Sequence, residues 1–124
     1  MSNYLKDLED SRLLFKTFCD GLMYGMYFYH GETLHRVTSI NGLDDTVNGV
    51  YPIRECRPCL RPMSSMTEEE EREVRILWNE DFADKISLYH CYPKTTDFYN
   101  KNHFDYRGLI EKDLALPATE NMYK

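Results

Sequence analysis

Cysteine and histidine are the residues of this chain whose types suit metal binding or thiol chemistry, and four of each occur in it. Cys56 and Cys59 form a CxxC pair, the spacing found in thioredoxin-type redox motifs and in half of a zinc site. Redox chemistry of this type needs the first cysteine at a helix N-terminus after a buried strand, and the preceding residues YPIRE do not form one. Both thiols are therefore expected to be buried or incidental groups in a reducing cytosol.

A zinc site is the second interpretation of the same pair, with His90 and Cys91 as further ligands. Adjacent residues on a strand point to opposite faces, so these two residues are poorly placed to bind one ion. The sequence has no HxxxH, HExxH or GxSxG motif and no phosphate-binding glycine loop. We therefore expect no cofactor and no enzymatic activity. A small zinc- or thiol-dependent nucleotide-handling enzyme that uses Cys56, Cys59 and Cys91 is the alternative.

Arginines and aromatic residues indicate two candidate binding surfaces. One follows the extended stretch at residues 51–61, and the other lies in NHFDYRG at residues 102–108. Arginine beside an aromatic residue is suited to phosphates, carboxylates and stacked rings, although pairing with the protein's own carboxylates is the simpler explanation. The candidate binding residues are Tyr51, Arg54, Arg57, Arg61, His103, Tyr106 and Arg107.

The composition limits the partners of these surfaces. Twenty-one acidic against fifteen basic residues give a net charge of −6, which argues against general nucleic-acid binding. Ten tyrosines suit a core and also a surface that becomes buried on binding, and they are compatible with a homodimer. The sequence has no long apolar run and its N-terminus does not resemble a signal peptide, so we expect a cytoplasmic protein without a membrane partner.

The elements that must position the candidate residues indicate an α+β fold in a single domain over residues 1–124. The apolar spacing predicts a helix from about residue 3 to 20, ended by Gly21. Residues 24–30 and 33–40 predict two strands joined by a turn, and a third strand follows over about 50–54. We expect a small, mostly antiparallel sheet covered by an N-terminal helix, a mid-chain helix and C-terminal helices.

The middle of the chain contains a proline-rich stretch and then a helix. Three prolines make residues 52–63 an improbable central strand, so an edge strand or an extended crossover is expected. Thr67 and Glu70 form a capping box for a helix that runs to about residue 79, with Trp78 turned inward. The run of glutamates is explained by the helix dipole.

The last part of the chain is expected to add a strand and two helices. Residues 86–92 predict a strand, and residues 96–103 a short helix anchored by Phe98 and Phe104. Residues 106–116 predict a final helix with its leucines inward, and residues 117–124 a loose tail.

Two stretches, CLRPMSSMTEEEERE at 59–73 and NHFDYRGLIEKDLALPATENMY at 102–123, resemble a family of short uncharacterised proteins of Bacteroidales phages, prophages and mobile elements. In that family a tyrosine usually stands at the position of Cys59 and a glycine at that of Asp113. The resemblance therefore implies that the CxxC pair is incidental to this chain.

Small phage proteins commonly act by binding. The resemblance thus implies a phage-encoded, non-enzymatic accessory protein that binds a host protein or a nucleotide-type ligand in the host cytoplasm, with counter-defence as one role. A virion or assembly component is another alternative.

Overall fold

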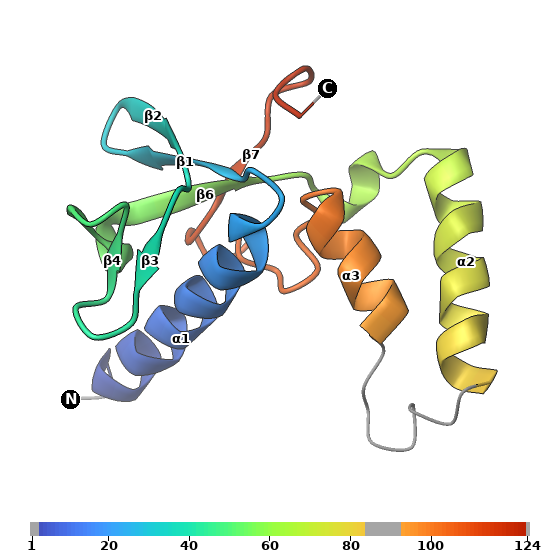
Figure 1. Cartoon of the computed structure of the whole chain (residues 1–124), viewed down its shortest axis with the longest axis horizontal. Helices are drawn as coiled ribbons and strands as arrows, with labels where there is room; N and C mark the ends of the chain where they lie inside the picture. Colours follow the sequence, from blue (N-terminus) through green and yellow to red (C-terminus); the bar gives the residue numbers. More distant parts are fainter. Residues whose placement is uncertain (1–2, 84–92, 124) are drawn as a thin grey trace.

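The computed structural model describes residues 3–83 and 93–123 (Figure 1). The strand expected at 86–92, with His90 and Cys91, lies outside the described residues. The fold is α+β, as expected. Its elements are α1 (Asn3–Leu22), β1 (Tyr27–His30), β2 (Thr33–Arg36), β3 (Ile40–Asn41), β4 (Thr46–Val47), β5 (Tyr51–Pro52), the 3-10 turn η1 (Ile53–Glu55), β6 (Cys56–Leu60), the 3-10 turn η2 (Met63–Ser65), α2 (Glu68–Ala83), α3 (Pro93–Lys101) and β7 (Leu116–Pro117).

Two small sheets form the β part of the described residues. The first has the order β2-β1-β6-β7 and is antiparallel except for the parallel pair β6 and β7. The second has the order β3-β4-β5 and is antiparallel. The predicted hairpin of β1 and β2 is confirmed, whereas the predicted third strand, β5, belongs to the second sheet.

β6 corrects the expectation that residues 52–63 stay at an edge, because it lies between β1 and β7. Its proline, Pro58, is opposite Phe28, and β7 first pairs with β6 one residue later, at Cys59. A proline nitrogen has no hydrogen to donate, so it is tolerated where no neighbouring strand requires one. A central strand can therefore contain Pro58 without losing a ladder hydrogen bond.

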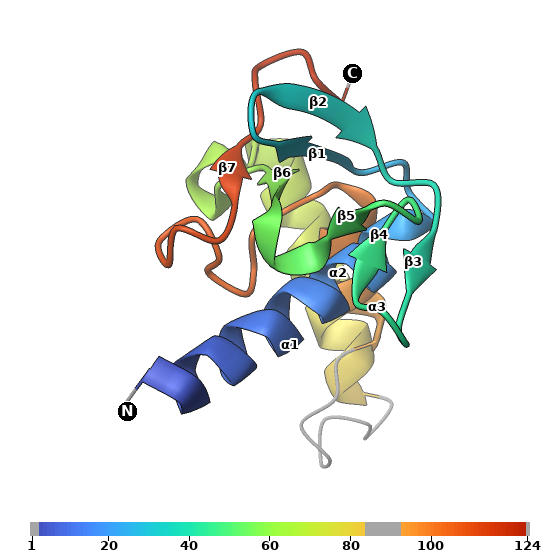
Figure 2. The same ribbon diagram turned by 90° about the vertical axis from the view of Figure 1, so that its left-hand side faces the viewer.

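α1 covers one face of the first sheet, and the C-terminal segment lies on the other side (Figure 2). Phe18 of α1 meets Phe28 of β1 edge to face, with ring centroids 5.6 Å apart, and both side chains are fully buried. Burial of each such ring contributes about 2 to 3 kcal/mol. This contact holds the helix to the sheet.

α1 continues past Gly21, which was expected to end it. A Cβ at Gly21 would lie 2.6 Å from the sulfur of Met26, so the glycine leaves room for this buried side chain. The left-handed residue of the turn is Gly25, with φ of 68°.

α2 begins with the predicted capping box. The Thr67 nitrogen donates to Glu70 Oε1 at 3.0 Å, and the Glu70 nitrogen donates to Thr67 Oγ1 at 3.2 Å. The expectation for Trp78 is wrong, because its side chain is 47% exposed and stacks on Phe82. α2 stands apart from the sheet and packs mainly against α3, so only one side of it is covered (Figure 1).

α3 confirms the predicted short helix, and its N-terminus is capped from α2. The buried carboxylate of Asp81 accepts hydrogen bonds from the Lys94 nitrogen at 3.0 Å and from the nitrogen and hydroxyl of Thr95 at 2.8 Å. Burial alone would raise the pKa of Asp81, but these hydrogen bonds outweigh it and lower the pKa. Phe98 and Phe104 are buried as predicted.

The final helix predicted at 106–116 is absent, and turns stand in its place. Asp105 accepts hydrogen bonds from the nitrogens of Leu109 and Ile110, at 2.7 and 3.0 Å, which competes with helical pairing. Gly108 and Asp113 have φ of 73° and 60°, outside the helical region. Leu109 is nevertheless fully buried, so its inward position was predicted correctly.

The segment expected as a loose tail is fixed to the sheet by Tyr123. Its hydroxyl donates to the Cys59 oxygen at 2.6 Å and accepts from the Tyr27 nitrogen at 2.9 Å. Its ring stacks on His103 with centroids 3.6 Å apart. The phenol thus joins β1 to β6 just beyond the last of their paired residues.

Candidate functional site

Arg61, expected on the first binding surface, is neutralised within the protein. Its guanidinium donates to both carboxylate oxygens of Glu70 at 2.8 Å and to the Ser65 oxygen at 3.2 Å, and it lies 4.2 Å above the ring of Phe104. The hydrogen bonds from Arg61, followed by those with Thr67, outweigh the opposing effect of burial and lower the pKa of Glu70 to about 2. Arg61 therefore joins parts of the fold and is not free to bind an anion.

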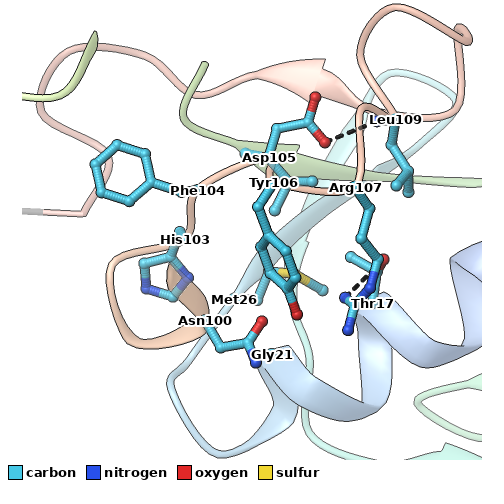
Figure 3. Close-up of a pocket in the computed structure, with 11 residues that line it drawn as sticks. Thr17, Gly21, Met26, Asn100, His103, Phe104, Asp105, Tyr106, Arg107 and Leu109 are labelled. Carbon is cyan, nitrogen blue, oxygen red and sulfur yellow. Dashed lines mark hydrogen bonds between the residues drawn. The ribbon is translucent and has the colours of Figure 1, made fainter. Parts of the chain in front are cut away.

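Arg107, on the second expected surface, is likewise engaged within the protein. Its guanidinium forms an ion pair with Asp20, approaches the Thr17 hydroxyl at 3.3 Å and lies 4.6 Å from the Tyr106 ring centroid. Figure 3 shows Tyr106 and Arg107 side by side, both directed toward α1. The Arg107 side chain is only 12% exposed.

His103 is buried against the same cluster and is a neutral side chain at pH 7. Burial, followed by the nearby charge of Arg61, lowers its pKa to about 4. The hollow that His103 lines together with Tyr106 and Arg107 has a volume of about 10 Å³, enough for about one water molecule. The second expected surface is thus a packed polar cluster and not a ligand pocket.

Tyr51 and Arg57 point to opposite faces of the structure, so the residues expected on the first binding surface do not lie together. Tyr51 packs on His35 and His30 with ring centroids 4.6 and 4.7 Å apart, on the side of the first sheet that α1 covers. Arg57 is the cross-strand partner of Tyr29, one position along from Phe28, and therefore projects from the other side. Arg54 lies in η1 and forms an ion pair with Asp7 at 3.3 Å.

The side chains that project away from α1 form a surface that we call the outer sheet face. Cross-strand register places Leu34, Tyr29 and Arg57 in one row across β2, β1 and β6, and Arg36 beside Tyr27 in the next. All five are at least partly exposed. The outer sheet face is Tyr27, Tyr29, Leu34, Arg36 and Arg57.

Neither arginine of the outer sheet face has its charge compensated by another described residue. Arg57 donates to the backbone oxygens of Arg54 and Cys56 at 2.9 and 3.1 Å, which orients the guanidinium without neutralising it. Within residues 3–83 and 93–123, no carboxylate forms a salt bridge with Arg57 or Arg36. The Tyr27 ring packs on Tyr123 with centroids 5.7 Å apart, so the surface offers mainly the two guanidinium groups and the Tyr29 ring to a partner.

Sequence reasoning found Arg57 but missed its neighbours. The alternation in YFYH and TLHR was the available signal, because residues two apart on a strand share a face. No signal in the sequence indicated that β6 pairs with β1, and this pairing brings Arg57 beside Tyr29.

Cys56 and Cys59 are poorly suited to thiol or metal chemistry. They are three residues apart on β6, so their side chains point to opposite faces. Both are fully buried, and burial raises the pKa of each thiol to about 11. In the part of the chain that the structure describes, no three His, Cys, Asp or Glu side chains come close enough to hold a metal ion.

A separate groove of about 520 Å³ lies between the start of α2 and the C-terminal segment. Its charged lining residues are Arg61, Glu69, Glu70 and Glu120, and Tyr123 lines it as well. Because Arg61 is already paired with Glu70, the net charge of this lining is negative. The groove therefore does not fit the anionic ligand expected for Arg61.

Comparisons with protein-family models, with curated proteins and with solved structures gave no match. Within the described ranges, no helix is long and apolar enough to cross a membrane.

Proposed function

We propose that this chain is a non-enzymatic accessory protein of a phage or mobile element, which binds an acidic patch of a host protein through its outer sheet face. The resemblance at residues 59–73 and 102–123 supports this source, and counter-defence is the role that this source favours. The observation that supports this proposal is the row of Leu34, Tyr29 and Arg57 across three strands, with no carboxylate of residues 3–83 and 93–123 paired to the arginine.

The residue types of this surface favour a protein partner. Tyrosine and arginine are enriched at protein interfaces, where the ring supplies contact area and the guanidinium binds carboxylates in pairs. A sheet face is flat, whereas small-molecule sites are usually concave and enclose most of the ligand. The partner is therefore expected to present carboxylates around a small apolar patch that meets Leu34.

A nucleotide is the second ligand to test, because tyrosines on a sheet can stack on bases. The net charge of −6 disfavours a long polyanion, so this alternative is limited to a mononucleotide or short oligonucleotide. A panel of mononucleotides, titrated by calorimetry, would distinguish the two ligands.

The deciding experiment is affinity capture from host lysate with quantitative mass spectrometry, followed by titration of the captured protein. Arg57→Glu and Tyr29→Ala should each reduce its affinity at least tenfold. Arg72→Glu reverses an exposed charge on α2 and should leave the affinity unchanged. A partner whose binding is unaffected by Arg57→Glu, Arg36→Glu and Tyr29→Ala would contradict the proposed surface.

A further inference from the structure

α1 carries a second apolar stripe beside the face that packs in the core. Leu14 and Phe18 are buried in the core, and Phe15 of the second stripe is partly buried against its edge. Along this second stripe, residues recur at alternating spacings of three and four, which is the a and d pattern of a coiled coil. This seam consists of Leu5, Leu8, Arg12, Phe15, Cys19 and Leu22.

The seam is exposed to solvent over much of its length. Leu5 is 72% exposed, Leu8 41% and Leu22 38%. A helix with apolar residues on both sides normally has both sides covered, and α1 has one covered by the sheet. The N-terminal half of α1 also extends beyond the sheet, so a second helix has access to it (Figure 2).

A groove of about 500 Å³ runs along the seam. On the turn between β3 and β4 it is lined by Gly42 and Asp45, and on α1 by Leu8, Ser11, Arg12, Phe15, Lys16 and Cys19. A Cβ on Gly42 would lie 3.4 Å from the Phe15 ring, so the turn is close against the helix at this point. The groove has one helical wall and an open side.

We infer that the occupant of this groove is α1 of a second copy of the chain, packed antiparallel. In antiparallel register each a position meets a d position, so Arg12 of one copy lies on Phe15 of the other, and the reverse. A guanidinium over an aromatic ring is favourable. Parallel pairing would instead place the two Arg12 charges together inside the seam.

Charge complementarity beside the seam supports the same arrangement. Glu9 and Lys16 both occupy the e position that flanks the seam on one side, and they are oppositely charged. Antiparallel pairing brings Glu9 of each copy near Lys16 of the other and forms two equivalent ion pairs. The self-complementary pattern favours a second copy over an unrelated helix. This inference is independent of the outer sheet face.

The test exploits the reciprocity of these two ion pairs. Glu9→Lys places like charges opposite each other in a homodimer, and so does Lys16→Glu. Mixing the two variants restores both attractive pairs. Sedimentation equilibrium should show a concentration-dependent dimer for the unsubstituted protein, a dissociation constant raised at least fivefold for each variant, and recovery in the equimolar mixture.

Matched controls and a geometric readout complete the experiment. Glu32→Lys and Lys112→Glu reverse exposed charges outside α1 and should leave the dissociation constant unchanged. In a Cys91→Ser background, Leu8→Cys places a thiol opposite Cys19 of the other copy. Oxidised glutathione, which accepts the two electrons, should then link position 8 to Cys19 between chains.

Three outcomes would overturn the inference. They are a monomer at all concentrations, a mixture of the two charge variants that does not recover the dimer, and a Cys19 to Cys19 disulfide without the Leu8→Cys substitution. The last result would show parallel pairing. Circular dichroism of each variant separates these outcomes from misfolding.

Discussion

Arg61 and Glu70 form a paired hydrogen bond, with both guanidinium-to-carboxylate distances at 2.8 Å. The pair connects the end of β6 to the first turn of α2. Arg61 also exchanges backbone hydrogen bonds with the C-terminal segment: its nitrogen donates to the His103 oxygen at 2.7 Å, and its oxygen accepts from the Asp105 nitrogen at 2.9 Å. One residue therefore joins three parts of the fold.

Arg61→Met should lower the free energy of unfolding by about 1 to 3 kcal/mol, because it leaves the partly buried carboxylate of Glu70 without its charged donors. Chemical denaturation followed by circular dichroism measures the change. Arg57→Met removes an arginine that has no carboxylate partner among the described residues, and it should cost less than about 0.5 kcal/mol. Equal losses in the two variants would contradict the assigned role of Arg61.

Lowering the pH should reduce the free energy of unfolding, because Glu70 becomes protonated. Its pKa in the folded protein is about 2, below the ordinary value of 4.5, so the folded state binds this proton more weakly than the unfolded state does. The stabilisation is fully present above pH 4.5 and is lost as the pH falls from 4.5 toward 2. Glu70→Gln should flatten the dependence of the unfolding free energy on pH in that range. An unchanged dependence in this variant would show that Glu70 is not the group responsible.

Tyr123→Phe should destabilise the protein by about 1 to 3 kcal/mol. It removes the hydroxyl that accepts from the Tyr27 nitrogen and donates to the Cys59 oxygen, and it leaves both backbone groups without this partner. Hydrogen exchange at the Tyr27 amide should accelerate more than exchange at the Phe28 amide. Tyr29→Phe, at a partly exposed position of the same strand, serves as the control and should have little effect.

Asp113→Gly should stabilise the protein by up to about 1 kcal/mol, because Asp113 has φ of 60°, a conformation that glycine adopts without strain. The resembling family usually carries glycine at this position. Glu111→Gly, in the same turn region but at an ordinary φ, should be neutral or destabilising. Thermal unfolding compares the two, and a lower melting temperature for Asp113→Gly would contradict the prediction.

Cys56 and Cys59 should resist alkylation until the protein unfolds. Burial raises the pKa of each thiol to about 11, so little reactive thiolate is present at pH 8, and both sulfurs are shielded from reagent. Cys19 is exposed in a single copy and should react with iodoacetamide first at protein concentrations where the chain is monomeric. Peptide mapping by mass spectrometry gives the order, and early labelling of Cys56 would revive the thiol-enzyme alternative.

Local signals in the sequence predicted local structure well. The reciprocal side-chain bonds of Thr67 and Glu70 were predictable because both residues lie within one turn. The hairpin of β1 and β2 followed from a turn between two β-rich runs. In each case the partner residues are close in the chain, so spacing alone identifies them.

Errors arose where distant residues decide the structure. Pro58 could not be placed in a central strand from sequence, because its tolerance depends on where β7 begins. The turns at 106–116 depend on the Asp105 carboxylate and on two left-handed residues, which override an apolar spacing that suits a helix. The carboxylates that neutralise Arg61 and Arg107 come from other elements, so neither pair follows from residue type.

The parallel pairing of β6 with β7 has a consequence for how the chain folds. Cys59 pairs with Leu116, and α2, α3 and the following turns separate the two residues in the sequence. β1 and β2, by contrast, are joined by a short turn. Closing so long a loop is entropically costly, and contacts of this kind form late and slowly. Refolding should accordingly show early protection of the β1–β2 hairpin and delayed protection of the Ala118 amide, which donates to the Leu60 carbonyl oxygen at 2.8 Å.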